Sequence, residues 1–158
     1  MTAVIENTVD IARTPEAVFD YLSDLRNELS WNPDCVSVEK LTDGPVGTGA
    51  RFRAKWKQGP AIETECTTFD RPRAWRYENG GPVSLVLTIT LQPTPTGTRM
   101  TSHGAWTPNG WFRLLFPVFI RVMRRAERGV VANARRALED GRDRSSPRLP
   151  EASPEGAA

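Results

Sequence analysis

Histidine and cysteine are the scarcest reactive residues in this 158-residue chain, which has one His and two Cys. The cysteines, Cys35 and Cys66, lie far apart and show no metal-ligand spacing, so we predict two reduced thiols, no metal site and no cofactor.

A long apolar run is also missing. The most apolar stretch, Leu114 to Ile120, is too short to cross a bilayer and is followed directly by Arg121. No signal peptide opens the sequence, so we expect a cytoplasmic protein without a transmembrane segment.

Excess charge of one sign is missing as well. The formal net charge is only +2, which gives no electrostatic reason to expect a nucleic-acid partner. The charge is nevertheless uneven, because ten arginines stand against four carboxylates between Arg113 and Arg148. A solvated arginine face on a helix explains this pattern, and a weak contact with an anionic surface or partner is the alternative.

Strands dominate the first two thirds of the chain. Apolar and polar residues alternate in seven segments, which are residues 3–11, 35–41, 51–57, 61–69, 75–78, 83–92 and 97–106. Short turns rich in Gly, Pro and Asn join the second to the seventh, which predicts an antiparallel meander. After the first strand, Thr14-Pro15-Glu16 predicts a short helix with Thr14 as its N-cap, and a second helical turn is expected at 25–29.

A long amphipathic helix is predicted at residues 109–140. Its apolar side chains recur in steps of three or four, at Phe112, Leu115, Phe119, Val122, Ala126, Val130, Ala134 and Ala137. We expect Asn109 to cap it, and Pro117 either to kink it near Phe116 or to mark where a preceding helical piece meets the main helix. Such a helix needs a surface that buries its apolar face. We therefore predict an α+β fold over residues 1–140, in which a curved seven-stranded antiparallel sheet grips the helix, and a disordered polar tail at 141–158.

Several short motifs add to this order of elements. They are Thr14 to Phe19 after the first strand, Leu22-Ser23-Asp24, Trp31-Asn32-Pro33, Pro72-Arg73 and Gly97 to Thr101. With them, residues 2–140 resemble the helix-grip fold of the START/SRPBCC superfamily, and most closely its polyketide cyclase/dehydrase-like branch. The resemblance implies one domain with an apolar cavity between the concave face of the sheet and the long helix. It implies no single function, because the superfamily includes lipid carriers, cyclases, dehydratases and hormone receptors.

Strand alternation and the helix stripe predict which residues face this cavity. The predicted ligand-binding residues are Trp31, Phe52, Trp56, Ile62, Thr64, Cys66, Trp75, Tyr77, Leu87, Met100, Ser102, Trp106, Phe112, Leu115, Phe119 and Met123. The same alternation places Thr68 inward, provided that no β-bulge shifts the frame. The inward set contains no Asp, Glu, Lys, Arg or His, so its polar groups are hydroxyls and one thiol. General acid–base catalysis needs a group with a tunable pKa, whereas an apolar pocket with a few hydroxyls is typical of ligand binding.

Individual side chains leave alternatives open. The aromatic residues can form core rather than ligand contacts, and the Tyr77 hydroxyl can orient a ligand carbonyl or bond to the backbone. Cys66 is most simply a small buried residue. The catalytic candidates are Tyr77, His103 and Asp34; His103 falls on the outward frame, and Asp34 is the carboxylate nearest to a cavity mouth.

Three functions follow from these patterns. We expect a protein that binds a small hydrophobic molecule, such as a lipid, an isoprenoid or a polyketide-like compound. A polyketide cyclase/aromatase or dehydratase that uses the same cavity is the alternative suggested by the resemblance. A third hypothesis is a regulatory or stress-related protein that docks through Trp111–Phe119 and the arginine face, by a weak membrane-surface or homodimer contact.

Overall fold

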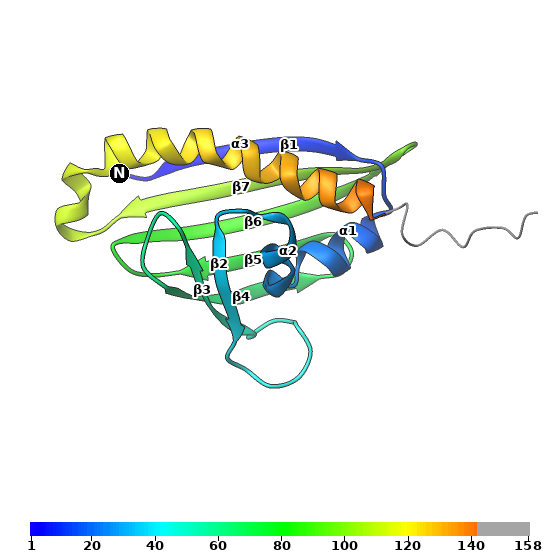
Figure 1. Cartoon of the computed structure of the whole chain (residues 1–158), viewed down its shortest axis with the longest axis horizontal. Coiled ribbons are helices and arrows are strands. Elements are labelled where there is room, and N and C mark those ends of the chain that lie inside the picture. Colours follow the sequence, from blue (N-terminus) through cyan, green and yellow to red (C-terminus); the bar gives the residue numbers. More distant parts are fainter. Residues whose placement is uncertain (142–158) are drawn as a thin grey trace, which may run out of the picture.

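The computed structural model describes residues 1–141 and contains one seven-stranded antiparallel sheet. The strands are β1 (Ala3–Ile11), β2 (Cys35–Lys40), β3 (Arg51–Trp56), β4 (Ile62–Asp70), β5 (Ala74–Asn79), β6 (Val83–Thr94) and β7 (Gly97–Pro108). Their order in the sheet is β1-β7-β6-β5-β4-β3-β2, so β2 to β7 form a meander and β1 pairs with its last strand. The predicted α+β helix-grip fold is confirmed (Figure 1).

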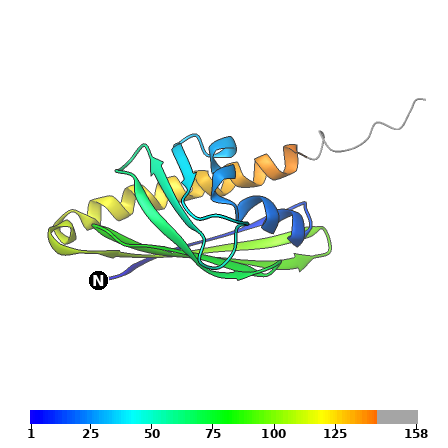
Figure 2. The same cartoon turned by 90° about the horizontal axis from the view of Figure 1, so that it is seen from below.

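The helices lie together on one face of the sheet (Figure 2). They are α1 (Pro15–Leu22), the 3₁₀ helix η1 (Leu25–Asn27), α2 (Glu28–Trp31), the 3₁₀ helix η2 (Gly110–Leu114) and α3 (Phe116–Asp140). Thr14 caps α1 as predicted, because its hydroxyl accepts a hydrogen bond from the Ala17 backbone N–H at 3.3 Å. The helical turn predicted at 25–29 consists of two pieces, and the second extends to Trp31.

The long helix begins later than predicted, at Phe116 instead of Asn109. Asn109 does not cap it, because its side-chain amide donates to the Gly81 carbonyl at 2.7 Å and to the Ser84 hydroxyl at 2.8 Å. Pro117 lies in the first turn of α3, where a residue without an N–H breaks no helical hydrogen bond. The second of the two predicted roles of this proline is therefore correct: η2 is the helical piece that meets the main helix.

Two apolar clusters attach the helices to the sheet. In the larger one, the Phe19 ring of α1 makes edge-on contacts with Phe69 and Trp75, with ring centroids 4.9 Å and 5.1 Å apart. In the smaller one, Phe116 and Ile120 at the start of α3 pack with Ile5 of β1. The middle of α3 lies between these two clusters, and this spacing leaves room for a cavity beneath it.

A β-bulge between Cys66 and Thr68 changes the inward frame of β4. Beyond the bulge Thr68 is exposed, and Phe69 turns towards the core instead. The inward placement of Thr68 predicted from alternation is therefore wrong, because the bulge inserts one residue that does not alternate.

The predicted tail at 141–158 falls, apart from Gly141, outside the described residues. No helix within residues 1–141 is both long enough and apolar enough to span a bilayer.

Candidate functional site

A cavity of about 460 Å³ lies between the sheet and α3. Strands β4 to β7 supply one wall, with side chains such as Thr64, Leu87 and Ser102. Helix α3 supplies the facing wall, which includes Phe119 and Ala126. Most of the accessible lining is apolar, so the cavity offers mainly dispersion and hydrophobic contact to an occupant.

Most of the predicted ligand-binding residues line this cavity. They are Trp31, Trp56, Ile62, Thr64, Trp75, Tyr77, Leu87, Met100, Ser102, Trp106, Phe112, Phe119 and Met123. The structure places the other three elsewhere: Phe52 and Cys66 are fully buried in the core, and Leu115 is half exposed outside the cavity.

The cavity also holds ionisable side chains, which corrects the expectation of a lining without them. Glu28 of α2, Asp34 after α2 and Glu127 of α3 all line it, whereas the lining contains no Lys, Arg or His. Strand alternation could not find Glu28 and Glu127, because both come from helices. A signal for Glu127 was present, since it follows Met123 by four residues and so falls on the inward stripe of α3.

Glu28 is buried, with only 9% of its surface exposed, and is held by two side-chain donors. Its Oε1 accepts hydrogen bonds from Asn32 Nδ2 at 2.5 Å and from Trp56 Nε1 at 2.8 Å. Burial raises the pKa of the Glu28 carboxyl, and the two hydrogen bonds oppose this rise. Asn32 also accepts a bond from the Asp34 backbone N–H at 3.0 Å, so one network fixes α2, the following turn and β3.

Glu127 is half-buried and points to the same cavity. Within residues 1–141, no group forms a hydrogen bond or an ion pair with its carboxyl group. Burial, and secondly the negative charge of Glu28, raise the pKa of Glu127 to about 7. This carboxyl therefore changes its protonation state near neutral pH.

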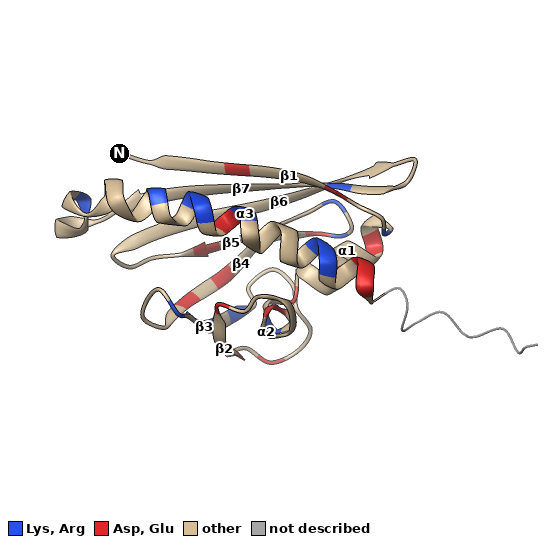
Figure 3. Ribbon diagram, turned by 45° about the horizontal axis from the view of Figure 1, so that its top comes forward, with Lys and Arg blue, Asp and Glu red and all other residues tan. Residues whose placement is uncertain are grey.

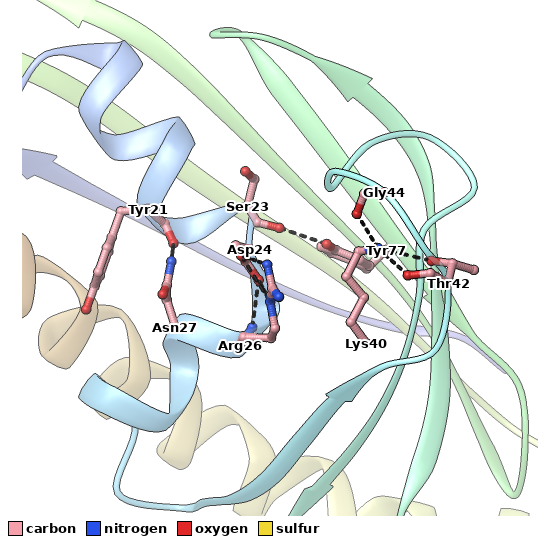
Figure 4. Close-up of polar contacts among 9 residues, drawn as sticks. All are labelled: Tyr21, Ser23, Asp24, Arg26, Asn27, Lys40, Thr42, Gly44 and Tyr77. Atoms are coloured by element: carbon pink, nitrogen blue, oxygen red, sulfur yellow. Dashed lines mark hydrogen bonds and ion pairs between the residues drawn. The ribbon is translucent and has the colours of Figure 1, made fainter.

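The Tyr77 hydroxyl is engaged by the backbone (Figure 4). It donates a buried hydrogen bond to the Ser23 carbonyl at 2.7 Å, and burial raises its pKa above the ordinary value. This is the backbone alternative left open by the sequence. Nearby, the Lys40 ammonium donates to the carbonyl oxygens of Thr42 and Gly44, which orders the loop after β2 (Figure 4).

The other catalytic candidates occupy different places. His103 is exposed on the outer face of β7, where its Nδ1 lies 3.1 Å from Glu6 of β1, and it does not line the cavity. Asp34 lines the cavity mouth and lies 3.6 Å from the Lys57 ammonium. Burial raises the pKa of the Cys66 thiol, which gives it little thiolate character.

Two indole N–H groups at the cavity have no hydrogen-bond partner within residues 1–141. They belong to Trp31 and Trp106, and both nitrogens are buried. The Trp106 ring packs over Gly104, where a Cβ atom would come within 3.0 Å of Trp106 Nε1. Gly104 therefore sets the position of this indole in the wall.

Residues 2–139 match the sequence family described as polyketide cyclase / dehydrase and lipid transport. The chain belongs to this family. The match covers every described strand and nearly all of α3, so both walls of the cavity lie within the family domain. No curated protein sequence matches the chain significantly.

Solved structures show the same fold as this member of the cyclase/dehydrase family. A protein of unknown function from Staphylococcus aureus, SA2116, aligns with a TM-score of 0.71 at 13% identity, over 90% of this chain and 97% of that one. The di-domain ARO/CYC protein StfQ of the steffimycin biosynthetic pathway aligns with a TM-score of 0.72 at 12% identity, over 90% of this chain and 52% of that one. Ara h 8.0201 aligns with a TM-score of 0.67 at 14% identity, over 87% and 98%. This chain thus spans about half the length of StfQ.

Proposed function

We propose that the protein binds a small, mainly apolar molecule in the cavity between the sheet and α3. The observation that carries this proposal is the cavity itself, with a volume of about 460 Å³ and a largely apolar and aromatic lining. Pockets for small molecules have volumes of roughly 300–1,000 Å³ and combine such a lining with a few polar groups. The membership in a family of cyclases, dehydrases and lipid transporters supports the same function.

The ionisable groups of the lining narrow the class of ligand. Glu28, Asp34 and Glu127 are all acidic, and of these three only Asp34 forms an ion pair among the described residues. A ligand carboxylate placed near Glu28 and Glu127 would meet like charges in a poorly solvated space. A neutral isoprenoid or polyketide-like molecule, or one with a cationic end, therefore fits this lining better than an ionised fatty acid does.

A displacement experiment with a fluorescent apolar dye tests this function. Nile red, which is uncharged, should bind to the protein and be displaced by dodecanol and dodecylamine more readily than by dodecanoate at pH 8. Ala126→Trp should fill the cavity from α3 and weaken dye binding about tenfold or more, whereas Ala132→Trp on the exposed side of the same helix should leave it unchanged. Equal dye binding by both folded variants would contradict the proposal.

A second candidate function is catalysis of ring closure, and Glu127 is the observation that favours it. A carboxyl whose pKa is raised to about 7 can take up and return a proton near neutral pH. In this scheme the Glu127 carboxylate removes a proton from a carbon next to a ligand carbonyl. The resulting enolate carbon attacks a second carbonyl carbon of the same molecule, and the new alkoxide takes the proton back from Glu127. Burial keeps the pKa of Glu127 high, and the charge of Glu28 adds to this rise.

Turnover of a simple substrate separates this candidate from binding alone. A 1,5-diketone with an apolar tail closes to a ring that absorbs in the ultraviolet after loss of water. Wild-type protein should accelerate this closure, and Glu127→Gln should abolish the acceleration while Nile red binding is kept. Glu65→Gln, which removes an exposed carboxyl on β4, should have no effect. If Glu127→Gln turns over as fast as wild type, catalysis by this group is excluded and the binding function stands.

A further inference from the structure

A group of large apolar side chains at one end of the molecule has no cover among the described residues. We define the end patch as Trp111, Leu114, Leu115, Val118 and Val122, which are between 50% and 86% exposed. The patch follows η2 and the first two turns of α3, at the end of the molecule where β7 leads into η2 (Figure 1). Clustered exposed apolar groups of this kind mark interaction surfaces more often than isolated ones do.

Exposed arginines lie in the same segment as the end patch. Arg113 of η2 and Arg121, Arg124 and Arg125 of α3 are exposed, and none of them pairs with an acidic group in residues 1–141. Helical spacing places Arg121 and Arg125 on the same face as Val118 and Val122, because residues three or four apart are neighbours on a helix. Figure 3 shows the basic segments of α3 in blue, with an acidic segment near the middle of the helix and another at its end.

We propose that the end patch docks the protein on an anionic lipid surface. Apolar side chains mixed with unpaired cations fit the boundary between the headgroups and the acyl chains of a bilayer. The apolar side chains are buried among the acyl chains, and the cations contact lipid phosphates. Trp111 of the patch is 70% exposed, and tryptophan is a residue type that prefers this boundary. The shallow burial of one helix face needs no membrane span.

A second copy of the chain fits the end patch less well. In a twofold dimer the same patch meets itself, so the arginines of one copy would approach those of the other. Such a contact brings together Arg121 and Arg125 of both copies without an acidic partner on this face. An anionic bilayer supplies the opposite charge instead.

The end patch adjoins the cavity, because Trp111 belongs to both and the neighbouring Phe112 also lines the cavity. Docking would therefore bring this end of the cavity to the bilayer surface, where an apolar ligand could enter or leave without crossing water. This ligand-exchange role rests on the proposed binding function, whereas the docking itself does not.

Vesicle flotation with the full chain tests the docking. The protein should float with vesicles of equal parts phosphatidylcholine and phosphatidylglycerol, far less with phosphatidylcholine alone, and less as salt is added. Arg121→Glu with Arg125→Glu should lower partitioning at least about thirtyfold. Leu114→Ser with Val118→Ser should lower partitioning at least about tenfold, because less apolar surface is then buried in the bilayer. Both side chains are exposed and neither lines the cavity, so these changes leave the cavity intact.

Matched changes outside the end patch serve as controls. Lys55→Glu on β3 reverses an exposed charge and Val36→Ser on β2 removes an exposed apolar group, and both should partition as wild type does. Equal flotation on neutral and anionic vesicles would overturn the proposal. So would a concentration-dependent dimer that Leu114→Ser dissociates, found together with no vesicle binding. Nile red binding without vesicles should survive in the patch variants, so failure of docking and failure of the cavity function remain distinguishable.

Discussion

Glu28 and Trp56 join two distant parts of the chain at the cavity. The indole N–H of Trp56 donates to Glu28 Oε1 at 2.8 Å, and this bond connects α2 with the end of β3. Because the Glu28 carboxyl is buried, the bond also replaces hydration that the carboxylate loses on folding. The acidic end of the cavity is thus built from a helix, a strand and the Asn32 amide between them.

Trp56→Phe should destabilise the protein, because it keeps an aromatic ring but removes the donor to Glu28 together with part of the indole. A buried charged acceptor that loses a partner costs about 1–3 kcal/mol. The loss in free energy of unfolding, measured with urea, should grow as pH rises, since the ionised carboxylate needs the donor more than the neutral carboxyl does. Trp111→Phe is the control, because this ring is 70% exposed and its replacement should change stability little. An equal loss in both variants would show that the bond from Trp56 to Glu28 does not stabilise the protein.

Glu127 should make the stability of the protein depend on pH. Its pKa is about 7 in the folded state against 4.5 as the ordinary value, so between these two the folded state binds more protons than the unfolded one. This contribution favours folding at low pH and is lost as pH rises through about 7. Glu127→Gln should therefore be more stable than wild type at pH 8, on the order of 1–3 kcal/mol, with little advantage at pH 4. Urea unfolding across this range measures the difference, and a difference that does not vary with pH would contradict the raised pKa.

Tyr77→Phe should lower the stability of the protein and leave its affinity for a ligand nearly unchanged. The variant loses the hydrogen bond from the hydroxyl to the Ser23 carbonyl and leaves that buried carbonyl without this donor. We expect a loss of about 1–2 kcal/mol in the free energy of unfolding. The Nile red dissociation constant should stay within about twofold, because the hydroxyl already serves the backbone and the ring keeps its place in the wall. A large loss of dye affinity without a loss of stability would instead assign the hydroxyl to the ligand.

The sequence predicts the fold well because its periodicities are strong and local. The alternation in residues 51–57 and the apolar stripe of α3 each follow from one element, and the order of these elements carried the family resemblance. The errors arise where two elements interact. Thr68 was misplaced because a bulge depends on how β4 meets β5, and Asn109 was misplaced because its amide bonds to the turn before β6. Glu28 was not predicted to line the cavity, because the indole that holds it, Trp56, lies on another element.

Gly104→Ala should reshape the cavity wall. A Cβ at this position would lie 3.0 Å from Trp106 Nε1 and 3.5 Å from Leu85 Cδ1, and both of these side chains line the cavity. The added methyl group must push the indole away from the strand, which costs about 1–3 kcal/mol of stability and takes space from an occupant. Nile red affinity should fall roughly threefold to tenfold as the indole moves.

Gly129→Ala is the matched control for this change. Nothing lies within 4 Å of a Cβ at Gly129 of α3, so alanine should stabilise the helix by about 1 kcal/mol and leave dye affinity unchanged. If Gly104→Ala also binds the dye as wild type does, the Trp106 indole does not bound the space that the dye fills. In that case the binding volume lies nearer the acidic end, between Trp56 and Glu127. Dye affinity in the two variants therefore locates the ligand along the cavity.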